Sequence, residues 1–426
     1  MRKFVPKFIL SIYHFCLAYV GALIYGWPTK KMIVIGVTGT KGKTTTCNLI
    51  AQILTALGHK VGLTTTVNFQ IGEKEWINRE KQTMLGRLKL QKLLWRMRQA
   101  GCRYAVIETS SEGILQHRHR GIDYDIAVLT NLSPEHIERH GGFENYRRAK
   151  ERLFAAVARK KDGIGVYNLD DKHVEEFLKY SVKNKHGYYQ KIPNIHPLTG
   201  GSTPNKYQIT DIKLQSDGTE FKVNGVSFKT KLIGEMNVYN LTAALVVAAA
   251  QGYPLESLRA ITEKLKPPAG RLQLVSAGQN FTVVIDYAHE PASLKAAYQA
   301  ARLFKPRRLI AVLGAQGGGR DQGKRGQLGE VAGNFADYIF VTNEDPYDEN
   351  PVQIIVDVAA GVRGKPVEKI VDRQKAIIAA LKLAQPGDLV LISGKGGEVS
   401  MCVAGGRQIP WSDEKIVCDY LAGRRS

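Results

Sequence analysis

A chain of 426 residues is too long for one ordinary hydrophobic core, so two or three domains are expected. With 44% hydrophobic and 23% charged residues, the composition excludes a disordered chain. The formal net charge of +21 favours anionic partners, whether nucleotides, carboxylates, nucleic acids or acidic lipids, without choosing among them. The five cysteines form no CxxC pair, which argues against a zinc site or a disulfide framework.

The chain begins with a hydrophobic leader, residues 1–31, in which residues 8–27 carry no charge. Twenty helical residues rise about 30 Å, which is enough to span a bilayer core. Lysines flank both ends, so the charge pattern sets no orientation. Three interpretations stay open: contact with the membrane surface, which is favoured, a full span, or a helix packed on the protein. The expected location is cytoplasmic, at the inner face of the cell membrane.

A phosphate-binding loop follows the leader directly. MIVIGV at 32–37 predicts a buried parallel strand, and CNLIAQILTALG predicts a helix that ends at Gly58. Between them, TGTKGKTTT has the glycines that let backbone N–H groups close on phosphate oxygens. Lys43 supplies a positive charge, and the hydroxyl of Thr44 is suited to Mg²⁺. The general pattern GxxxxGK[ST] is missed at one place, because its first glycine falls on Val37.

Two further strands are predicted to end at the same edge of the sheet. YAVIETSS predicts a strand that ends in Glu108, a second candidate Mg²⁺ ligand, with a solvated loop acid as the alternative. DIAVLTNL predicts the next strand, which His136, His140 and Lys150 follow. The residues from 184 to 205 are rich in Gly, Pro, Asn and His and predict a loop.

These segments resemble the Mur ligase family, and the type that adds the third residue, lysine or diaminopimelate, to UDP-N-acetylmuramoyl-dipeptide matches best. The resemblance implies an α/β fold with a central P-loop ATPase domain at 32–269, built on a mostly parallel sheet, and a C-terminal Rossmann-like domain at 270–426. The UDP-binding domain that usually precedes the phosphate loop is expected to be absent. The matching motifs are GTKGKTTT at 39, ETSS at 108, TNLSPEHIERHGGFENYRRAKERLF at 130, GEMNVYN at 234, PAGR at 268, DYAHEP at 286, GGGRDQGKRGQLGE at 317, ISGKGGE at 392 and WSD at 411.

The resemblance also implies the chemistry: ATP and Mg²⁺ as cofactors, and an amide bond formed through an acyl phosphate. The implied catalytic residues are Lys43, Glu108, His136 and Lys150, and Lys150 matches a lysine that is carbamylated in many members. The implied metal ligands are Thr44, Glu108, His136 and, if carbamylated, Lys150. The implied ATP-binding residues are Gly39, Thr40, Lys41, Gly42, Lys43, Thr44, Thr45, Asn240, Arg271, Asp286, Tyr287 and His289.

Substrate contacts follow from the same resemblance. The pattern SSxxxxQxR nominates Ser110, Gln116 and Arg118 for the acceptor peptide, although Glu112 stands where the family usually has histidine. Asp345, Tyr347, Gly394 and Glu398 are nominated for the incoming amino acid. Tyr347 occupies the position at which diaminopimelate enzymes carry an arginine for the distal carboxylate, and this slightly favours lysine.

Other interpretations stay open. One is a related ligase with a different acceptor: a lipid-linked precursor, or a cyanophycin-like or polyglutamate-like substrate. Another is a non-catalytic, membrane-associated nucleotide-binding subunit, which the intact set of site residues argues against. The basic segment 87–103 suggests nucleic-acid binding as a further possibility. Its apolar residues are better explained as the buried face of a helix, so no nucleic-acid partner is expected. The oligomeric state is left open.

Overall fold

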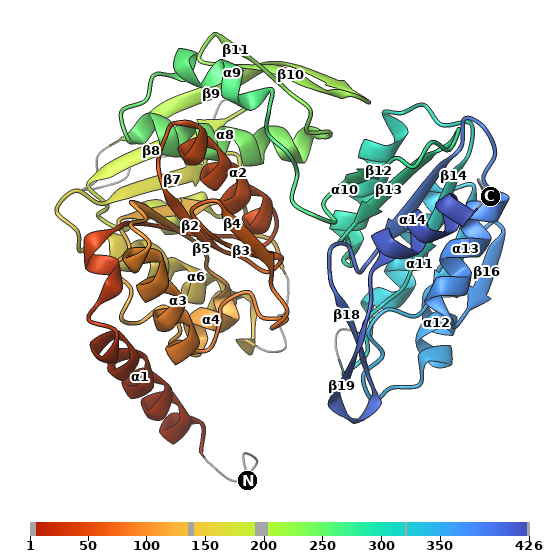
Figure 1. The fold of residues 1–426 in the computed structure, drawn as a ribbon, viewed down its shortest axis with the longest axis horizontal. Coiled ribbons are helices and arrows are strands. Elements are labelled where there is room, and N and C mark those ends of the chain that lie inside the picture. The colour runs from red at the N-terminus through yellow and green to blue at the C-terminus, as the bar shows by residue number, and fades with distance from the viewer. Residues whose placement is uncertain (1–5, 135–139, 192–202, 320–321, 424–426) are drawn as a thin grey trace. The chain divides into compact units, whose positions relative to one another are not determined.

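The computed structural model describes residues 6–134, 140–191, 203–319 and 322–423. It divides into two compact units (Figure 1). Unit 1 comprises Met1–Lys213, Thr219–Lys231 and Met236–Lys266, and unit 2 comprises Leu214–Gly218, Leu232–Glu235 and Pro267–Ser426. The functional boundaries expected at 31/32 and 269/270 stay predictions.

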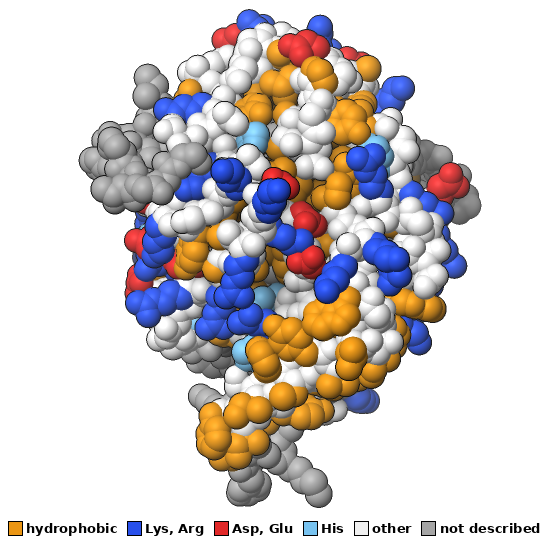
Figure 2. Space-filling view, turned by 90° about the vertical axis from the view of Figure 1, so that its left-hand side faces the viewer, with side chains coloured by type: hydrophobic (Ala, Val, Ile, Leu, Met, Phe, Trp, Pro, Cys, Tyr) orange, Lys and Arg blue, Asp and Glu red, His pale blue; other side chains and the backbone are white. Residues whose placement is uncertain are grey.

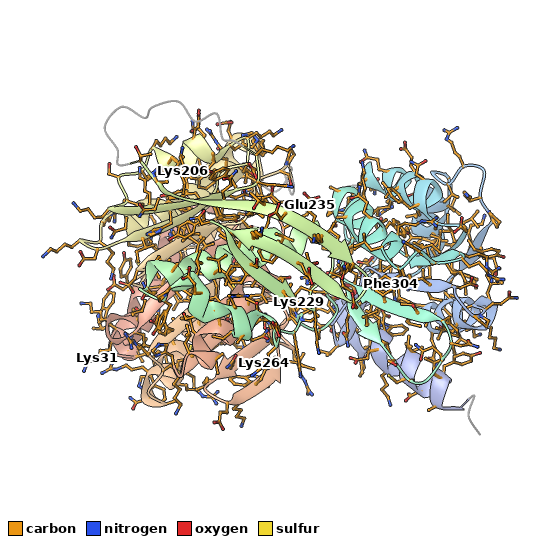
Figure 3. The ribbon with its side chains drawn as sticks, turned by 90° about the horizontal axis from the view of Figure 1, so that it is seen from above. Lys31, Lys206, Lys229, Glu235, Lys264 and Phe304 are labelled. Atoms are coloured by element: carbon orange, nitrogen blue, oxygen red, sulfur yellow. The ribbon has the colours of Figure 1, made fainter. Side chains whose placement is uncertain are left out.

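Unit 1 is built on an eleven-stranded sheet with the order β11-β10-β9-β8-β7-β6-β1-β5-β2-β3-β4. Neighbouring strands from β2 through β5, β1, β6, β7 and β8 to β9 are parallel, while β3–β4 and β10–β11 are antiparallel pairs. Lys206 in β9 and Lys229 in β11 mark the β9–β11 end of the sheet in Figure 3. The strands are β1 Ile33–Thr38, β2 Val61–Thr64, β3 Asn68–Ile71, β4 Lys74–Ile77, β5 Tyr104–Glu108, β6 Ile126–Leu129, β7 Ile164–Asn168, β8 Asn184–Tyr189, β9 Asn205–Gln215, β10 Gly218–Val223 and β11 Val226–Thr230.

The register of the three central strands positions the candidate site. β1 lies between β5 and β6, with Val37 opposite Glu108 and Thr38 opposite Leu129. The carboxyl ends of these parallel strands therefore meet at one edge, where open α/β sheets bind ligands. One expectation was wrong: residues 184–189 form strand β8 rather than a loop, because they add parallel to β7 with their central residues buried.

Helices cover the sheet of unit 1. α3 and α6 share a hydrophobic core with β5 and β6, in which Leu94, Phe154 and Ile107 are fully buried. α2 contacts β1, β2 and β5. The helices are α1 Lys7–Ile24, η2 Pro28–Lys31, α2 Lys43–Ala56, α3 Arg87–Gln99, α4 Ser111–Leu115, α6 Phe143–Val157, α7 Val174–Leu178, α8 Glu235–Ala250, η3 Leu255–Leu258 and α9 Arg259–Thr262.

The leader forms α1, which packs against α3 (Figure 1). Ala18 and Ala22 are buried in this contact, while most of the large apolar side chains of α1 are exposed. Within the described part of the chain, no helix is both long and apolar enough to cross a membrane.

Unit 2 has a six-stranded sheet with the order β12-β13-β17-β14-β15-β16, parallel except for β12. Alternate residues of β14 face opposite sides: Ala311 joins the core under α10–α12, and Val312 joins the core under α13 and α14. The elements are β12 Gln273–Val275, β13 Thr282–Asp286, α10 Pro291–Arg302, β14 Leu309–Leu313, α11 Lys324–Phe335, β15 Tyr338–Thr342, α12 Pro351–Ala359, β16 Val367–Ile370, α13 Arg373–Leu383, β17 Leu389–Ser393, β18 Ser400–Val403, η4 Ala404–Gly406, β19 Arg407–Pro410 and α14 Asp413–Gly423.

Candidate active site

The predicted phosphate loop connects β1 to the N-terminus of α2. Gly42 caps this helix with φ of 81°, in the left-handed region where glycine carries no steric cost. The loop is closely packed: a Cβ on Gly39 would lie 1.9 Å from Oγ1 of Thr130, and one on Gly42 would lie 2.2 Å from Oδ1 of Asn240. Both positions therefore require glycine. Asn240, predicted for ATP binding, lies against the loop from α8.

Residues that follow β6 hold the loop in shape. The backbone N–H of Lys41 donates to Oδ1 of Asn131 at 2.9 Å, and the hydroxyl of Thr130 donates to the Lys41 carbonyl at 2.6 Å. The ammonium of Lys43 folds back onto the Thr40 carbonyl at 2.8 Å. These bonds hold the backbone of the loop beside the helix N-terminus, where the backbone dipoles favour an anion. Asn131 and Thr130 were missed from the sequence, although they belong to the quoted TNL motif.

Lys150 lies beneath the same loop. Its side chain is buried, and its ammonium donates to the Gly39 carbonyl at 2.6 Å and lies 4.5 Å from the ring centre of Tyr146. The Tyr146 hydroxyl is 3.0 Å from the hydroxyl of Thr40. Lys150 thus reaches the phosphate loop from α6. His136 lies outside the described residues.

Glu108 and Thr44 form the candidate metal site. The Thr44 hydroxyl donates to Oε2 of Glu108 at 2.9 Å, and the backbone N–H of Thr66 donates to the same oxygen at 2.8 Å. Oε1 accepts no hydrogen bond from the residues that the structure describes. A hydroxyl and a carboxylate beside a phosphate loop fit Mg²⁺, which takes few protein ligands and completes its shell with water and phosphate oxygens. In the described ranges, no three His, Cys, Asp or Glu residues converge as a metal cluster.

The residues nominated for the acceptor flank α4. Ser110 caps α4, its hydroxyl accepting from the Gly113 N–H at 3.1 Å. The guanidinium of Arg118 donates to Oε1 of Gln116 at 2.7 Å and to Oε1 of Gln82 at 3.0 Å. The structure therefore brings Gln116 and Arg118 together, whereas Ser110 is tied to its own helix.

In unit 2, the residues predicted to contact the nucleotide surround Tyr287. The guanidinium of Arg271 lies 4.2 Å from the ring centre of Tyr287, and the ring of His289 lies 4.6 Å from it on an edge. Both carboxylate oxygens of Asp286 accept backbone N–H groups, from Leu272 at 2.7 Å and from Ala288 at 2.8 Å. Burial raises the pKa of Asp286, against the opposing charge of Arg271. Asp286 thus shapes the backbone at the end of β13.

Acidic side chains gather where β15 and β17 end. We call Glu344, Asp345 and Glu398 the acidic cluster. The ammonium of Lys395 is buried between them, 2.8 Å from Oδ1 of Asp345 and in contact with Oε2 of Glu398. Burial alone would lower the pKa of Lys395, but the carboxylates of Glu398 and Asp345 outweigh it and raise that pKa. The cluster therefore carries three carboxyl groups around one lysine.

Glu344 is the unusual member of the acidic cluster. Its side chain is fully buried, and neither carboxylate oxygen has a hydrogen-bond partner among the described residues. Burial raises the pKa of Glu344 to about 7, although the cations Lys395 and Arg373 oppose the shift. A buried carboxylate without partners is costly unless a ligand supplies donors. Sequence reasoning missed Glu344 and Lys395, although each lies beside a nominated residue.

A buried ion pair supports the strand ends that carry the acidic cluster. Arg373 donates two hydrogen bonds to Asp413, at 2.9 and 2.7 Å, and both side chains are fully buried. The same guanidinium donates to the Ser393 carbonyl at 2.9 Å. The indole N–H of Trp411 donates to Asp413 at 2.8 Å. This pair thus ties α13 and α14 to the end of β17, just before Gly394.

Comparison with known proteins identifies the family. The Mur ligase middle domain matches residues 37–248, and the Mur ligase, glutamate ligase domain matches residues 270–396. A UDP-N-acetylmuramyl-tripeptide synthetase of Roseiflexus sp. (strain RS-1) is 38% identical over 96% of this chain and 82% of its own length. The chain belongs to the Mur ligase family.

Another relative and two solved structures are also similar to this Mur ligase. A UDP-N-acetylmuramoyl-L-alanyl-D-glutamate–2,6-diaminopimelate ligase of Bacillus cereus is 34% identical over 99% of the chain and 84% of its own length. A solved structure of a ligase with that same name is 31% identical, covers 93% of this chain and 80% of its own, and superposes with a TM-score of 0.63. A MurF ligase of Thermotoga maritima in complex with ADP, 19% identical with a TM-score of 0.67 over 96% of this chain and 82% of its own, shares the fold.

Membership makes this chain an ATP-dependent ligase that forms amide bonds. The assignment agrees with the strand–loop–helix that carries Lys43 and Thr44, since Mur ligases use ATP. The roles of individual residues are proposals that rest on the geometry of the site and on the motifs.

Proposed function

We propose that this Mur ligase adds an amino acid with a side-chain ammonium, lysine or diaminopimelate, to the free carboxylate of a muramoyl-dipeptide. The observation that carries the proposal is the acidic cluster of unit 2. Glu344 has two unpartnered buried oxygens, and an ammonium has three N–H donors to offer them. Relatives between 34% and 38% identical are named as ligases of this type, which supports the acceptor.

Lysine is slightly favoured over diaminopimelate. The distal carboxylate of diaminopimelate needs a cation, and an arginine suits that task because its planar fork matches a carboxylate. Tyr347 occupies the position expected for this arginine, with φ of 53° and its N–H on the Cys402 carbonyl. Its side chain packs against Gly318, where an added Cβ would be 3.1 Å away. Tyr347 brings no positive charge.

Residues of each unit are assigned to ATP. We assign Gly39 to Thr45 and Asn240 to the phosphates, and Arg271, Asp286, Tyr287 and His289 to the nucleoside. Thr44 and Glu108 would hold Mg²⁺, with His136 as a further ligand. When bound, the ion neutralises charge on the phosphates and orients them. Lys43 adds a positive charge once its ammonium leaves the Thr40 carbonyl for a phosphate oxygen.

The proposed reaction has two steps. In the first, an oxygen of the acceptor carboxylate attacks the γ-phosphorus of ATP, the bond to ADP breaks, and an acyl phosphate forms. In the second, the amino nitrogen attacks the acyl carbon, the phosphate leaves, and the nitrogen loses its proton to give the amide. Cations must offset the negative charge that gathers in the first step, which is the role assigned to Lys43.

Lys150 has two possible states in this scheme. As an ammonium it holds the Gly39 carbonyl and stabilises the loop. As a carbamate it would present a carboxylate toward the metal, as the family resemblance implies. We assign the carbamate to the active enzyme, and Ser110, Gln116 and Arg118 to the acceptor. The ATPase half corresponds to 32–269, and the Rossmann-like half at 270–426 contributes the amino-acid site.

One experiment tests the proposal directly. The full chain is incubated with ATP, Mg²⁺ and soluble UDP-N-acetylmuramoyl-dipeptide, with lysine or diaminopimelate offered separately, and the product is read by mass spectrometry. We expect ADP and a tripeptide product, more with lysine, and neither with Lys43→Ala. If turnover requires a lipid-linked acceptor, the substrate is a lipid-linked muramoyl-peptide and not the UDP-linked one. If ATP is not turned over with either acceptor and either amino acid, the proposal is overturned.

Membrane association is a separate proposal, because it depends on the surface around α1 and not on the ligase chemistry. Turnover itself is placed in the cytoplasm, where ATP is supplied.

A further inference from the structure

Helix α1 carries apolar residues on the face that packs against α3 and also on the opposite, exposed face. The residues of α1 that are buried or half-buried are Leu10, Ser11, His14, Leu17, Ala18, Tyr19, Gly21 and Ala22, most of them at the spacing of three and four residues that defines one helix face. The positions between them are also hydrophobic, and an ordinary surface helix would carry polar residues there. The packing of unit 1 therefore does not explain why the exposed face of α1 is hydrophobic.

Specific contacts hold the packed face in place. The Ser11 hydroxyl is 2.8 Å from Nε2 of His117, and the rings of Tyr25 and Trp95 lie 6.2 Å apart. A Cβ on Gly121 would lie 2.8 Å from Cβ of Ala22, so glycine permits the close approach. These contacts, from both ends of the helix, fix which face of α1 is turned outward.

The outward face is unusually exposed for its residue types. Phe8 is 66% exposed, Leu23 68% and Ile24 65%. Trp95 and Leu88 of α3 extend the same surface at its edge, since Leu88 lies against Gly21 and Trp95 against Tyr25. Figure 2 shows hydrophobic side chains gathered along α1, with Lys and Arg side chains on the adjoining surface. The apolar surface consists of Phe8, Ile9, Ile12, Tyr13, Phe15, Cys16, Val20, Leu23, Ile24, Leu88 and Trp95.

The charge around this apolar surface is predominantly basic. The three segments that build it, 7–31, 87–103 and 113–122, contain no Asp or Glu, and the acids Glu112 and Asp123 flank the last of them. Lys89 is paired with Glu80 from outside these segments, at 2.7 Å. Arg120 lies 5.8 Å from the ring centre of Phe15, and Lys30 lies 5.3 Å from that of Trp27. The basic residues of the three segments are Lys7, Lys30, Lys31, Arg87, Lys89, Lys92, Arg96, Arg98, Arg103, Arg118 and Arg120.

We propose that this surface binds an anionic lipid bilayer, with α1 lying in the plane of the headgroups. An apolar helix face inserts about 5–10 Å into the headgroup boundary, and a basic rim adds attraction to acidic lipids. Tyr and Trp at the edges suit this zone because one end of each ring is apolar and the other polar. The packed face stays on α3, so the helix does not cross the membrane.

A second copy of the chain is the competing occupant. Two copies that met through this surface would bring two rims of positive charge together, and like charges across an interface weaken association. An anionic bilayer supplies the opposite charge. The basic excess of the rim is therefore the observation that selects the lipid surface.

Cys16 allows the inserted state to be read directly. It is exposed on the outward face of α1, while Cys47, Cys102 and Cys402 are buried and Cys418 is half-buried. A polarity-sensitive fluorophore is attached to Cys16 in a full-length Cys418→Ser background. With phosphatidylglycerol-rich vesicles, we expect a blue shift of the fluorescence and co-flotation of the protein. We expect the apparent affinity to be at least about tenfold lower for neutral phosphatidylcholine vesicles or in high salt. No shift with anionic vesicles would overturn the proposal.

Matched variants distinguish vesicle binding through the apolar surface from nonspecific adsorption of the protein. Ile12→Glu combined with Leu23→Glu places two charges on the outward face, whereas Ile77→Glu changes a 48% exposed residue of β4. We expect the double variant to lose binding by at least about tenfold and the control to keep it, with ATP turnover unchanged in both. Equal binding by the double variant would overturn the proposal. So would a concentration-dependent dimer, seen by sedimentation without lipid and abolished by the double variant.

Discussion

The hydroxyl of Thr44 donates a 2.9 Å hydrogen bond to Glu108, joining the start of α2 to the end of β5 across 64 residues of sequence. The bond exists because β5 pairs in parallel with β1, which places Glu108 opposite Val37. Sequence position predicted both residues as metal ligands, and the fold brings their oxygens together. The metal site is accordingly the first part of the proposal to test.

Glu108→Gln removes one charge and retains an oxygen that accepts the Thr66 N–H. We expect the apparent affinity for Mg²⁺ to fall by about 10- to 100-fold with little loss of folding stability. Activity is measured over a Mg²⁺ titration, with Glu73→Gln, an exposed residue before β4, as the control. An unchanged Mg²⁺ dependence in Glu108→Gln would remove this residue from the metal site.

Lys43→Ala tests the phosphate loop. Among the described residues, the Lys43 ammonium donates to its own loop through the Thr40 carbonyl, so its loss should leave the fold intact and abolish turnover. Turnover and nucleotide binding are measured beside circular dichroism, and Lys74→Ala on β4 serves as an exposed lysine control. Full activity in Lys43→Ala would refute the assignment.

Glu344→Gln tests the buried carboxyl through its pH dependence. The pKa of Glu344 rises from 4.5 to about 7 on folding, so the folded state holds this proton more tightly than the unfolded state. Its contribution to stability is present below pH 4.5 and is lost as pH rises through 7. Relative to the parent, Glu344→Gln should therefore gain about 2–3 kcal/mol of unfolding free energy between pH 5 and pH 8.

The measurement for Glu344 is chemical unfolding of both proteins at pH 5 and pH 8. Asp357→Asn is the control, because hydrogen bonds from Gln353 and Arg325 lower the pKa of Asp357 and its titration lies below this window. The same Glu344→Gln variant should bind lysine at least about tenfold more weakly, because a charge-assisted hydrogen bond is lost. A stability difference that does not change with pH would contradict the buried ionisation.

Tyr347→Arg tests amino-acid choice. An arginine there would offer a bidentate partner to the distal carboxylate of diaminopimelate. We expect the ratio of kcat/KM for diaminopimelate over lysine to rise about tenfold, which corresponds to about 1.4 kcal/mol. Tyr347→Phe is the control and should leave that ratio as it is. A ratio unchanged in the arginine variant would separate Tyr347 from the selection of the amino acid.

Asp413→Asn tests the support beneath the acidic cluster. It leaves the guanidinium of Arg373 buried without its full charge partner, and we expect unit 2 to lose about 3–5 kcal/mol. Hydrogen exchange in α13 and α14 reports this local loss. Adding Arg373→Met should recover part of the stability, because the unpaired charge is removed as well. Equal exchange in Asp413→Asn and the parent would show that the pair carries little energy.

The sequence by itself determined the elements whose cause is local. The strand, glycine loop and helix around Lys43 follow from hydrophobic periodicity, glycine spacing and a helix that stops before Gly58, all readable over 30 residues. The order of motifs also determined the family, and the comparisons confirmed it. Glu108 was predicted as a metal ligand because a carboxylate at the end of a buried strand has a distinctive local pattern.

Tertiary structure decided what depends on burial and on contacts distant in the chain. Glu344 and Lys395 lie beside nominated residues, but only the pairing of β14, β15 and β17 shows that they and Arg373 converge away from water. Strand β8 was misjudged because its Gly, Asn and His residues suggest a loop, and its pairing with β7 overrides that preference. Likewise, the leader sequence is apolar all round, and only packing on α3 decides which of its faces remains exposed.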